Sequence, residues 1–485
     1  MSDTSTPAIM ADRLRHAWRE ALGREPEPGS DFFGSGGDSL LIARMVSRLR
    51  REGVAVGPKD VLLGRTFDGI LQRLRPAPDA RAGLPLADAG TAPLLPTQAR
   101  WVANRFAEPD HFNLGWIFQL DERPEPGGIA EALRRLADRH EALRTAYDLA
   151  SATARVLPEV PGEPLTVLEV EEAEAGSALA AQQRGHDLAK GVVLSAAWVP
   201  GPRLLQVIVH HLTLDGYSLA VLADDLEELL LDGRAGEPPA VQPRQHAAAV
   251  QRWLDGPQAA EAEAAWARLP WDRVSPVPVE KTGPATLPTM TTVSGTLEEA
   301  PAGADALLTA AAATAVMERF DLPALSVDAY HHARDEFGAD LTRTIGYLQA
   351  TYPIVFRAGD AATWWERAQE DLRRLPAQRF SFDALRFTGG RKALGDLPSS
   401  LVRMNFRGQF ARLNERRSSR LRPAAQPPRG MRSPAQTEPY RLMLEGDVID
   451  DALTFTIKFS TDHYAVSTIE GLVQRTLELL SGRAR

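Results

Sequence analysis

The stretch His210-His211-Leu212-Thr213-Leu214-Asp215-Gly216 comes directly after the apolar run 204–209, which has the composition of a buried β-strand. The pattern therefore predicts a strand that ends in a loop bearing two imidazoles and a carboxylate. A histidine titrates near neutral pH, so His211 could take a proton from a substrate and return it. Asp215 would fix the loop, and Gly216 would allow a sharp turn of the backbone. Adjacent histidines are also often buried structural residues, and the stretch by itself leaves both roles open.

Composition excludes several classes of protein and site. The chain has 485 residues, of which 44% are hydrophobic and 25% charged, enough for two or three cores. It contains no cysteine, which excludes disulfides, thiolate nucleophiles and zinc-thiolate or iron–sulfur sites, and no metal site is predicted. A net charge of -9 argues against a nucleic-acid partner. No apolar run approaches the roughly 18 residues of a membrane span, so we expect a cytoplasmic protein without membrane association.

A second motif lies near the N-terminus. Residues 31–40 read DFFGSGGDSL, a glycine-rich loop that ends in Asp38 and Ser39 and precedes a helical apolar pattern. A serine at a helix start commonly caps the helix. The whole motif, however, resembles the peptidyl carrier proteins of nonribosomal peptide synthetases. The resemblance implies a four-helix carrier domain at residues 8–76, in which Ser39 holds covalent 4′-phosphopantetheine and Asp38 contacts the modifying enzyme. A phosphodiester at a helix N-terminus meets unpaired backbone N–H groups.

The rest of the chain is predicted to be one large domain. Residues 77–92 mix prolines and glycines with alanines, which indicates a partly extended linker. The pattern HHxxxDG at 210–216, followed by the amphipathic run 218–231, resembles the condensation and epimerisation domains of the same synthetases and their chloramphenicol-acetyltransferase-like relatives. The resemblance implies an α/β, V-shaped pseudo-dimer at 93–485, with sandwich halves at about 93–268 and 269–485. It places His211 in the tunnel between them and makes His210, His211, Asp215 and Gly216 the catalytic loop.

The C-terminal half supplies further candidates. Arg334 matches the arginine of the corresponding family motifs, and we expect it to form a buried ion pair with Asp215 that supports the loop, so that Asp215 is not a base. The basic segment 412–432 is predicted to be a solvated loop. The histidines at 331 and 332 are expected to be ordinary loop residues. The candidates for the acceptor side of the tunnel are Tyr330, Ser218 and Asn405.

Three functions remain to be weighed. In a condensation reaction, an aminoacyl or peptidyl thioester on the Ser39 arm is the donor, an amine attacks it, and His211 accepts a proton or stabilises charge. Epimerisation of the carrier-bound aminoacyl group needs two proton-handling groups, but Tyr330 stands where epimerisation domains have glutamate, and Phe406 where they have tyrosine. A silent domain that recruits a partner is disfavoured by the intact HHxxxDG. The sequence therefore favours amide-forming acyl transfer.

The resemblance also implies partners. No adenylation segment is visible, so we expect a separate adenylation domain or an upstream synthetase module to supply the acyl group. A phosphopantetheinyl transferase would modify Ser39. The acceptor would be a downstream carrier protein or a free amine.

Overall fold

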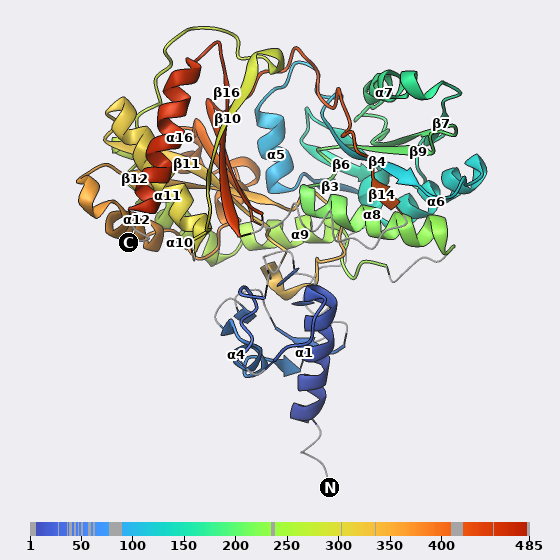
Figure 1. The fold of residues 1–485 in the computed structure, drawn as a ribbon, viewed down its shortest axis with the longest axis horizontal. Helices are drawn as coiled ribbons and strands as arrows, with labels where there is room; N and C mark the ends of the chain where they lie inside the picture. The colour runs from blue at the N-terminus through green and yellow to red at the C-terminus, as the bar shows by residue number, and fades with distance from the viewer. Residues whose placement is uncertain are drawn as a thin grey trace.

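The protein forms a small N-terminal unit and a large unit with two halves (Figure 1). The computed structural model describes residues 6–27, 29–35, 37, 41–42, 45–46, 48–49, 52–56, 60–61, 64–76, 90–233, 238–301, 303–334, 336–408, 421–449 and 451–482. Among the helices in these ranges, none is both long enough and apolar enough to cross a bilayer.

The small unit has a hydrophobic core of its own. Helix α1 buries Leu14, Trp18 and Leu22, which recur every four residues on one of its faces. The ring of Trp18 meets that of Phe32 edge-on, with centroids 5.2 Å apart. The elements with defined bounds are α1 (Thr6–Leu22), β1 (Val54–Ala55), α4 (Phe67–Leu71) and β2 (Arg75–Pro76).

The first half of the large unit (the N-half) is a layered α/β sandwich. Its main sheet has the strand order β14-β4-β9-β8-β7, and a smaller sheet has the order β3-β6-β5. Helices α6 and α8 pack on one face of the main sheet and α7 on the other. The bounds are β3 (Thr91–Pro93), α5 (Pro96–Ala103), β4 (Asn113–Leu120), α6 (Pro126–Arg139), β5 (Thr145–Asp148), β6 (Thr153–Val156), β7 (Leu165–Val167), α7 (Glu172–Ala181), β8 (Leu194–Val199), β9 (Leu204–His210) and α8 (Gly216–Leu231).

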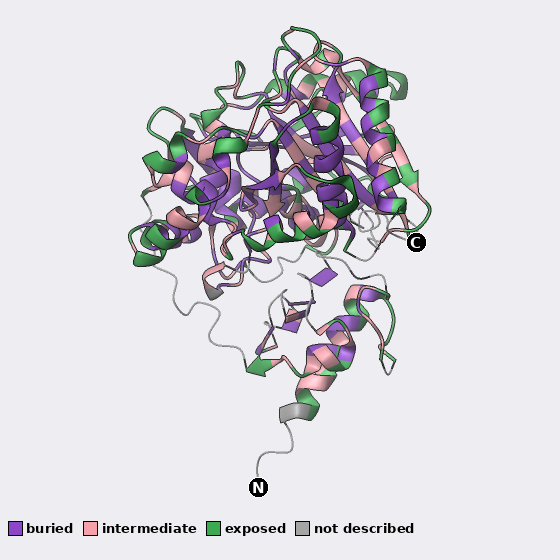
Figure 2. Cartoon of the chain, turned by 90° about the vertical axis from the view of Figure 1, so that its left-hand side faces the viewer, coloured by how far each residue is buried: buried purple, intermediate pink, exposed green. Residues whose placement is uncertain are grey.

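The second half (the C-half) repeats this design around a sheet of order β10-β16-β15-β13-β11-β12. Helices α11, α12 and α16 cover one face. Each half has its own hydrophobic core, and Figure 2 shows buried residues inside the large unit with exposed ones toward its periphery. The expected pair of α/β halves is thus confirmed. The bounds are α9 (Pro243–Leu254), α10 (Pro257–Ala267), β10 (Met290–Leu297), α11 (Ala304–Phe320), β11 (Ala324–His331), β12 (Ala350–Arg357), α12 (Trp364–Arg373), α13 (Ser381–Asp383), α14 (Lys392–Gly395), β13 (Val402–Gly408), β14 (Leu421–Pro423), β15 (Leu442–Ile449), β16 (Ala452–Ser460) and α16 (Val466–Ser481).

One strand from the C-terminal part of the chain joins the sheet of the N-half. Although β14 belongs to the C-half by sequence, it pairs with β4 of the N-half, with Leu421 opposite Leu120. Leu421 is buried in the N-half core. The prediction of a solvated loop is therefore wrong for 421–423, because a partner strand about 300 residues earlier supplies the ladder. Residues 412–420 of that segment lie outside the described residues. Likewise, β3 begins at Thr91 inside the expected linker and pairs with β6.

Candidate active site

The motif HHxxxDG forms the connection between β9 and α8. Strand β9 lies between β4 and β8, so hydrogen bonds on both sides fix the point where it ends at His210. The backbone N–H of His211 donates to the carbonyl of Phe112 at 2.7 Å. The loop is therefore positioned by the sheet and the helix that flank it.

His210 supports this loop and is not available for chemistry. Its Nε2–H donates to the carbonyl of Pro109 at 2.7 Å, and its Nδ1 accepts from the N–H of Leu212 at 3.1 Å. Burial lowers the pKa of His210 to about 3, so the ring is neutral. The prediction that His210 is catalytic is wrong, since both ring nitrogens already have partners.

In His211, unlike His210, only one ring nitrogen has a hydrogen-bond partner among the described residues. Its Nδ1 lies 3.0 Å from the carbonyl oxygen of Leu214, which can only accept, so Nδ1 carries the proton and Nε2 has the free lone pair. Among the described residues, none is hydrogen-bonded to Nε2. Burial, followed by the charge of Arg432, lowers the pKa of His211 to about 4. The ring lies between those of Phe112 and Tyr347, at centroid distances of 5.5 and 4.8 Å. His211 is a neutral imidazole with one nitrogen ready to accept a proton.

Asp215 holds the loop in place through four hydrogen bonds. It is the N-cap of α8, and its Oδ1 accepts from the N–H of Ser218 and from Arg334 Nη2, both at 2.8 Å. Its Oδ2 accepts from the N–H groups of Leu348 and Gln349 at 3.1 and 3.0 Å. Both oxygens are occupied, and the carboxylate fixes the loop to the C-half; that Asp215 is not a base stays a prediction.

The expected ion pair with Arg334 is present and buried. Arg334 and Asp215 side chains are each only 2% exposed. Arg334 also donates to the carbonyls of Leu341 and Thr344 and lies over the ring of Tyr217, 4.1 Å from its centre. A residue of the C-half thus completes the N-half loop.

Two expectations about this loop are wrong. Ser218 does not face a tunnel: its hydroxyl is fully buried, accepts from Arg334 and from the N–H of Gly346, and donates to the Gly346 carbonyl. Gly216 makes no turn that requires glycine, because its φ is not positive and a Cβ there would meet open space.

We expect Asp215→Ala and Arg334→Ala each to lower the free energy of unfolding by about 3 to 5 kcal/mol, because each leaves a buried charge unpaired. Thermal and denaturant unfolding measure the loss. The matched control is Arg407→Ala, whose ion pairs with Glu445 and Asp447 are partly exposed and should contribute about 0 to 1 kcal/mol. The double mutant should lose less than the sum of the single losses. Unchanged unfolding in both single mutants would contradict the role of the pair.

A second buried cluster joins the segment RHEALRT to both halves. His140 Nε2 lies 2.5 Å from Asp225 Oδ2 on α8, and Arg139 and Arg343 also bind that carboxylate. Burial and the two arginines lower the pKa of His140 to about 3. The cluster ties α6 to α8 and to the C-half, so the segment at 139–145 has a structural role.

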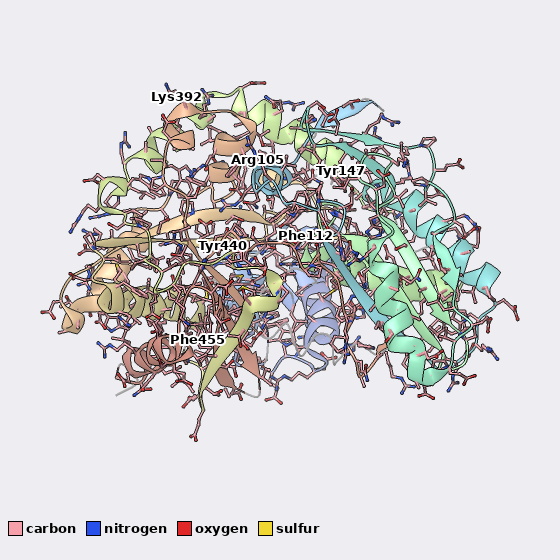
Figure 3. The ribbon with its side chains drawn as sticks, turned by 90° about the horizontal axis from the view of Figure 1, so that it is seen from above. Arg105, Phe112, Tyr147, Lys392, Tyr440 and Phe455 are labelled. Atoms are coloured by element: carbon pink, nitrogen blue, oxygen red, sulfur yellow. The ribbon has the colours of Figure 1, made fainter. Side chains whose placement is uncertain are left out.

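The remaining candidates, Tyr330 and Asn405, lie on strands β11 and β13 of the C-half. Arg403 Nη1 donates to Tyr330 Oη at 3.1 Å, and Asn405 follows Arg403 on the same face of β13. The guanidinium of Arg432 stacks on Phe112 at 4.2 Å. Figure 3 shows Phe112 and Tyr440 near the middle of the large unit. The tunnel-facing roles of Tyr330 and Asn405 remain predictions.

Sequence reasoning did not assign a role to several of these residues. The neighbours of His211 that it missed are Phe112, Tyr347 and Arg432. Tyr347 lies in the segment RTIGYL at 343–348, and its closeness in sequence to Arg334 is the signal that could have found it. Arg432 is the last residue of the basic segment 412–432. The composition of that segment predicted a solvated loop and gave no sign that Arg432 lies against Phe112.

The carrier loop is tightly packed. Asp31 accepts from the N–H groups of Phe33 and Gly34 at 2.9 Å and from Arg65. A Cβ on Gly37 would lie 2.2 Å from the ring of Phe32, so only glycine fits there. The first described helical residue after it is at 41. Ser39 and Asp38 themselves lie outside the described residues.

Two family matches cover this architecture. Residues 12–74 match the phosphopantetheine attachment site family, and residues 88–484 match the condensation domain family. The chain belongs to the condensation domain family. Its N-terminal unit is a carrier, and the cofactor of that carrier is covalent 4′-phosphopantetheine. A glycine pressed against Phe32, followed shortly by helix, fits a serine-borne phosphodiester at a helix start.

Individual relatives agree with this condensation-domain assignment. Chondramide synthase of Chondromyces crocatus is 26% identical over 503 residues, covering 94% of this chain but 13% of that synthase. The epimerization domain from the third module of tyrocidine synthetase B has a TM-score of 0.70 at 21% identity, covering 81% of this chain and 97% of that one. The X-domain in complex with OxyB from teicoplanin biosynthesis has a TM-score of 0.65 at 21% identity, covering 84% and 96%. These solved structures share the fold.

Proposed function

We propose that the chain is a carrier–condensation didomain of nonribosomal peptide synthesis, which transfers an acyl group from Ser39 to an amine and forms an amide. The observation that carries the proposal is the neutral His211, whose Nδ1–H is fixed by Leu214 and whose Nε2 is free to accept a proton. When bound, the pantetheine arm supplies a thiol that carries the acyl donor as a thioester.

The chain's own residues divide the work. His211 Nε2 accepts the proton that the attacking amine loses, or hydrogen-bonds to the charge that develops. As the new C–N bond forms, the C–S bond of the thioester breaks, and the proton lost by the amine passes to the released thiol. Asp215 and Arg334 are positioning residues, since they hold the loop and contact no reacting atom. The partners that this role requires are an adenylation domain or upstream module, a phosphopantetheinyl transferase, and a carrier-bound or free amine.

Epimerisation is the second candidate, favoured by the likeness in fold to an epimerization domain. It needs two groups that exchange protons with the α-carbon. The Tyr330 hydroxyl accepts from Arg403, whose positive charge stands beside it. Phe406 has no transferable proton and packs with the C-half core. Recruitment of a partner without chemistry, the third candidate, would leave His211 Nε2 without a role.

One assay separates these candidates. The carrier is loaded at Ser39 with labelled aminoacyl pantetheine, candidate amines are added in deuterated water, and both amide product and α-deuterium are measured. We expect amide only when an amine is present, and no exchange of the α-hydrogen. Exchange without an amine, abolished by Tyr330→Phe, would establish epimerisation, with Tyr330 as the acid. If neither amide nor α-deuterium is found, partner recruitment is the candidate that is left.

A further inference from the structure

Two positive side chains stand on the face of the C-half sheet that is turned toward the N-half. In the ladder, Arg403 lies opposite Asp328 of β11 and Met443 of β15, and Met443 lies opposite Lys458 of β16. Residues directly opposite one another project from the same face of a sheet. Arg100 of α5, in the N-half, binds Asp328 on this face. Arg403 and Lys458 therefore face the N-half.

Arg403 has few partners for a charged side chain in this position. Its Nη1 donates to Tyr330 Oη at 3.1 Å, and its guanidinium lies 5.3 Å from the ring centre of Tyr440. Its Nε is buried and has no hydrogen-bond partner. Within the described ranges, neither Arg403 nor the half-buried Lys458 forms an ion pair with a carboxylate. Burying a cation without a counter-ion is costly.

The acids in this neighbourhood already have cations of their own. Their ion pairs are Glu438 with Arg432 at 2.8 Å, Glu445 with Arg407 at 3.1 Å, and both Asp328 and Asp383 with Arg100. Although burial lowers the pKa of Arg403, the nearby phenols and the charges of Glu438 and Glu445 raise it. Within the described ranges neither acid forms an ion pair with Arg403 or Lys458, so an incoming anion would not have to displace a bound carboxylate from either cation.

Arg403 acts on an aromatic neighbour of the reacting imidazole. The ring of Tyr347 is 4.8 Å from that of His211. Burial raises the pKa of Tyr347, and the charges of Arg403 and Arg432 act in the opposite direction on the same phenol. Tyr347 thus packs against His211, and the charge of Arg403 acts on its phenol.

We propose that Arg403, with Lys458 two strands away on the same face of the sheet, binds a carboxylate of the substrate and selects for substrates that carry one. The inference rests on the proposed function and names its substrate class. The planar guanidinium can grip a carboxylate through two parallel hydrogen bonds, whereas Lys458 adds a point charge. The carboxylate can come from either substrate. If the acceptor is a free amino acid, it is the α-carboxylate of that acceptor; if the donor acyl group has an acidic side chain, it is the carboxylate of that side chain.

Two pairs of substrates distinguish these sources. In the acceptor arm, free alanine is compared with alaninamide, using a neutral donor. In the donor arm, glutamyl is compared with glutaminyl on the carrier, using a neutral amine. We expect the charged member to be preferred by about 10- to 100-fold in kcat/KM in one arm, mainly through KM, as for a charge-assisted hydrogen bond. Arg403→Gln should abolish this preference.

The matched control is Arg407→Gln, on the same strand but with carboxylate partners of its own, and it should keep the preference. Arg403→Lys should keep part of it, and thermal unfolding establishes that each variant folds. Equal rates within both pairs for the parent protein, or a preference that survives Arg403→Gln, would overturn the inference.

A binding measurement separates this inference from the proposed function. Saturation-transfer NMR compares glutarate with glutaramide as probes of the unloaded protein. We expect glutarate to bind the parent and to lose binding in Arg403→Gln. Such binding in a protein that forms no amide would preserve this inference while refuting the proposed reaction. Equal or absent binding of the two probes to the parent would refute the inference.

Discussion

Replacement of His211 by alanine is expected to slow amide formation from the loaded carrier by about 100- to 10,000-fold, the range typical of a lost general base. The reason is geometric. With Nδ1–H committed to Leu214, Nε2 is the one ring nitrogen free to take the proton of the amine. Single-turnover assays with a preloaded carrier measure the chemical step directly. A defect of less than about tenfold would indicate that His211 only positions the substrate.

Controls separate this effect from damage to the fold. The His211→Ala protein should still accept one pantetheine arm, as intact mass would show. His463→Ala is the matched substitution, because its imidazole bonds to the Gly283 carbonyl in the C-half, away from the loop. It should leave the amide-forming rate unchanged.

The pH dependence gives an independent test of the same nitrogen. With the pKa of His211 near 4, the imidazole stays neutral above about pH 5 and is protonated only below that range. Amide formation should therefore lack the inflection near pH 6.5 that an ordinary histidine would impose. Rates must be taken where the protein is folded. Unfolded histidines titrate near 6.5, so buried neutral ones such as His140 and His210 reduce stability as the pH falls below that value. An inflection near pH 6.5 would contradict the described environment.

Periodicity and apolar spacing predicted most of the elements around the site. The run 204–209 became β9 (Leu204–His210), and the amphipathic run 218–231 became α8 (Gly216–Leu231). These signals are local, because a strand or helix facing a core repeats its apolar residues at its own period. The ion pair of Asp215 with Arg334 was anticipated from family motifs.

Local patterns could not separate the roles of like residues. His210 and His211 are adjacent and chemically identical, yet His210 is satisfied by Pro109, about 100 residues away, whereas His211 Nε2 has no such partner among the described residues. Ser218 is withdrawn from the site by Gly346, again through a distant contact. The pairing of Leu421 with β4 likewise depends on a strand about 300 residues earlier, which no window of sequence contains.

Replacement of Ser39 by alanine should abolish modification of the carrier completely. The side-chain hydroxyl is the group that a phosphodiester bond requires, and alanine has no atom in its place. Intact-mass measurement after treatment with a phosphopantetheinyl transferase and coenzyme A should show one arm on the parent protein and none on Ser39→Ala. Ser35→Ala, in the same loop, is the matched control and should accept one arm. Modification of Ser39→Ala, or none on the parent, would refute the assignment.

A second substitution shows that the loss in Ser39→Ala is chemical. Gly37→Ala would bring a Cβ within 2.2 Å of the Phe32 ring, so the loop or the aromatic core must shift. Modification should then fall because the carrier unfolds, which amide hydrogen exchange in α1 would detect. In Ser39→Ala the same amides should remain protected, since the loss of a helix cap costs only about 0.5 to 2 kcal/mol. Equal loss of protection in both variants would mean that Ser39 acts chiefly as a cap, and that the missing modification reflects an unfolded carrier.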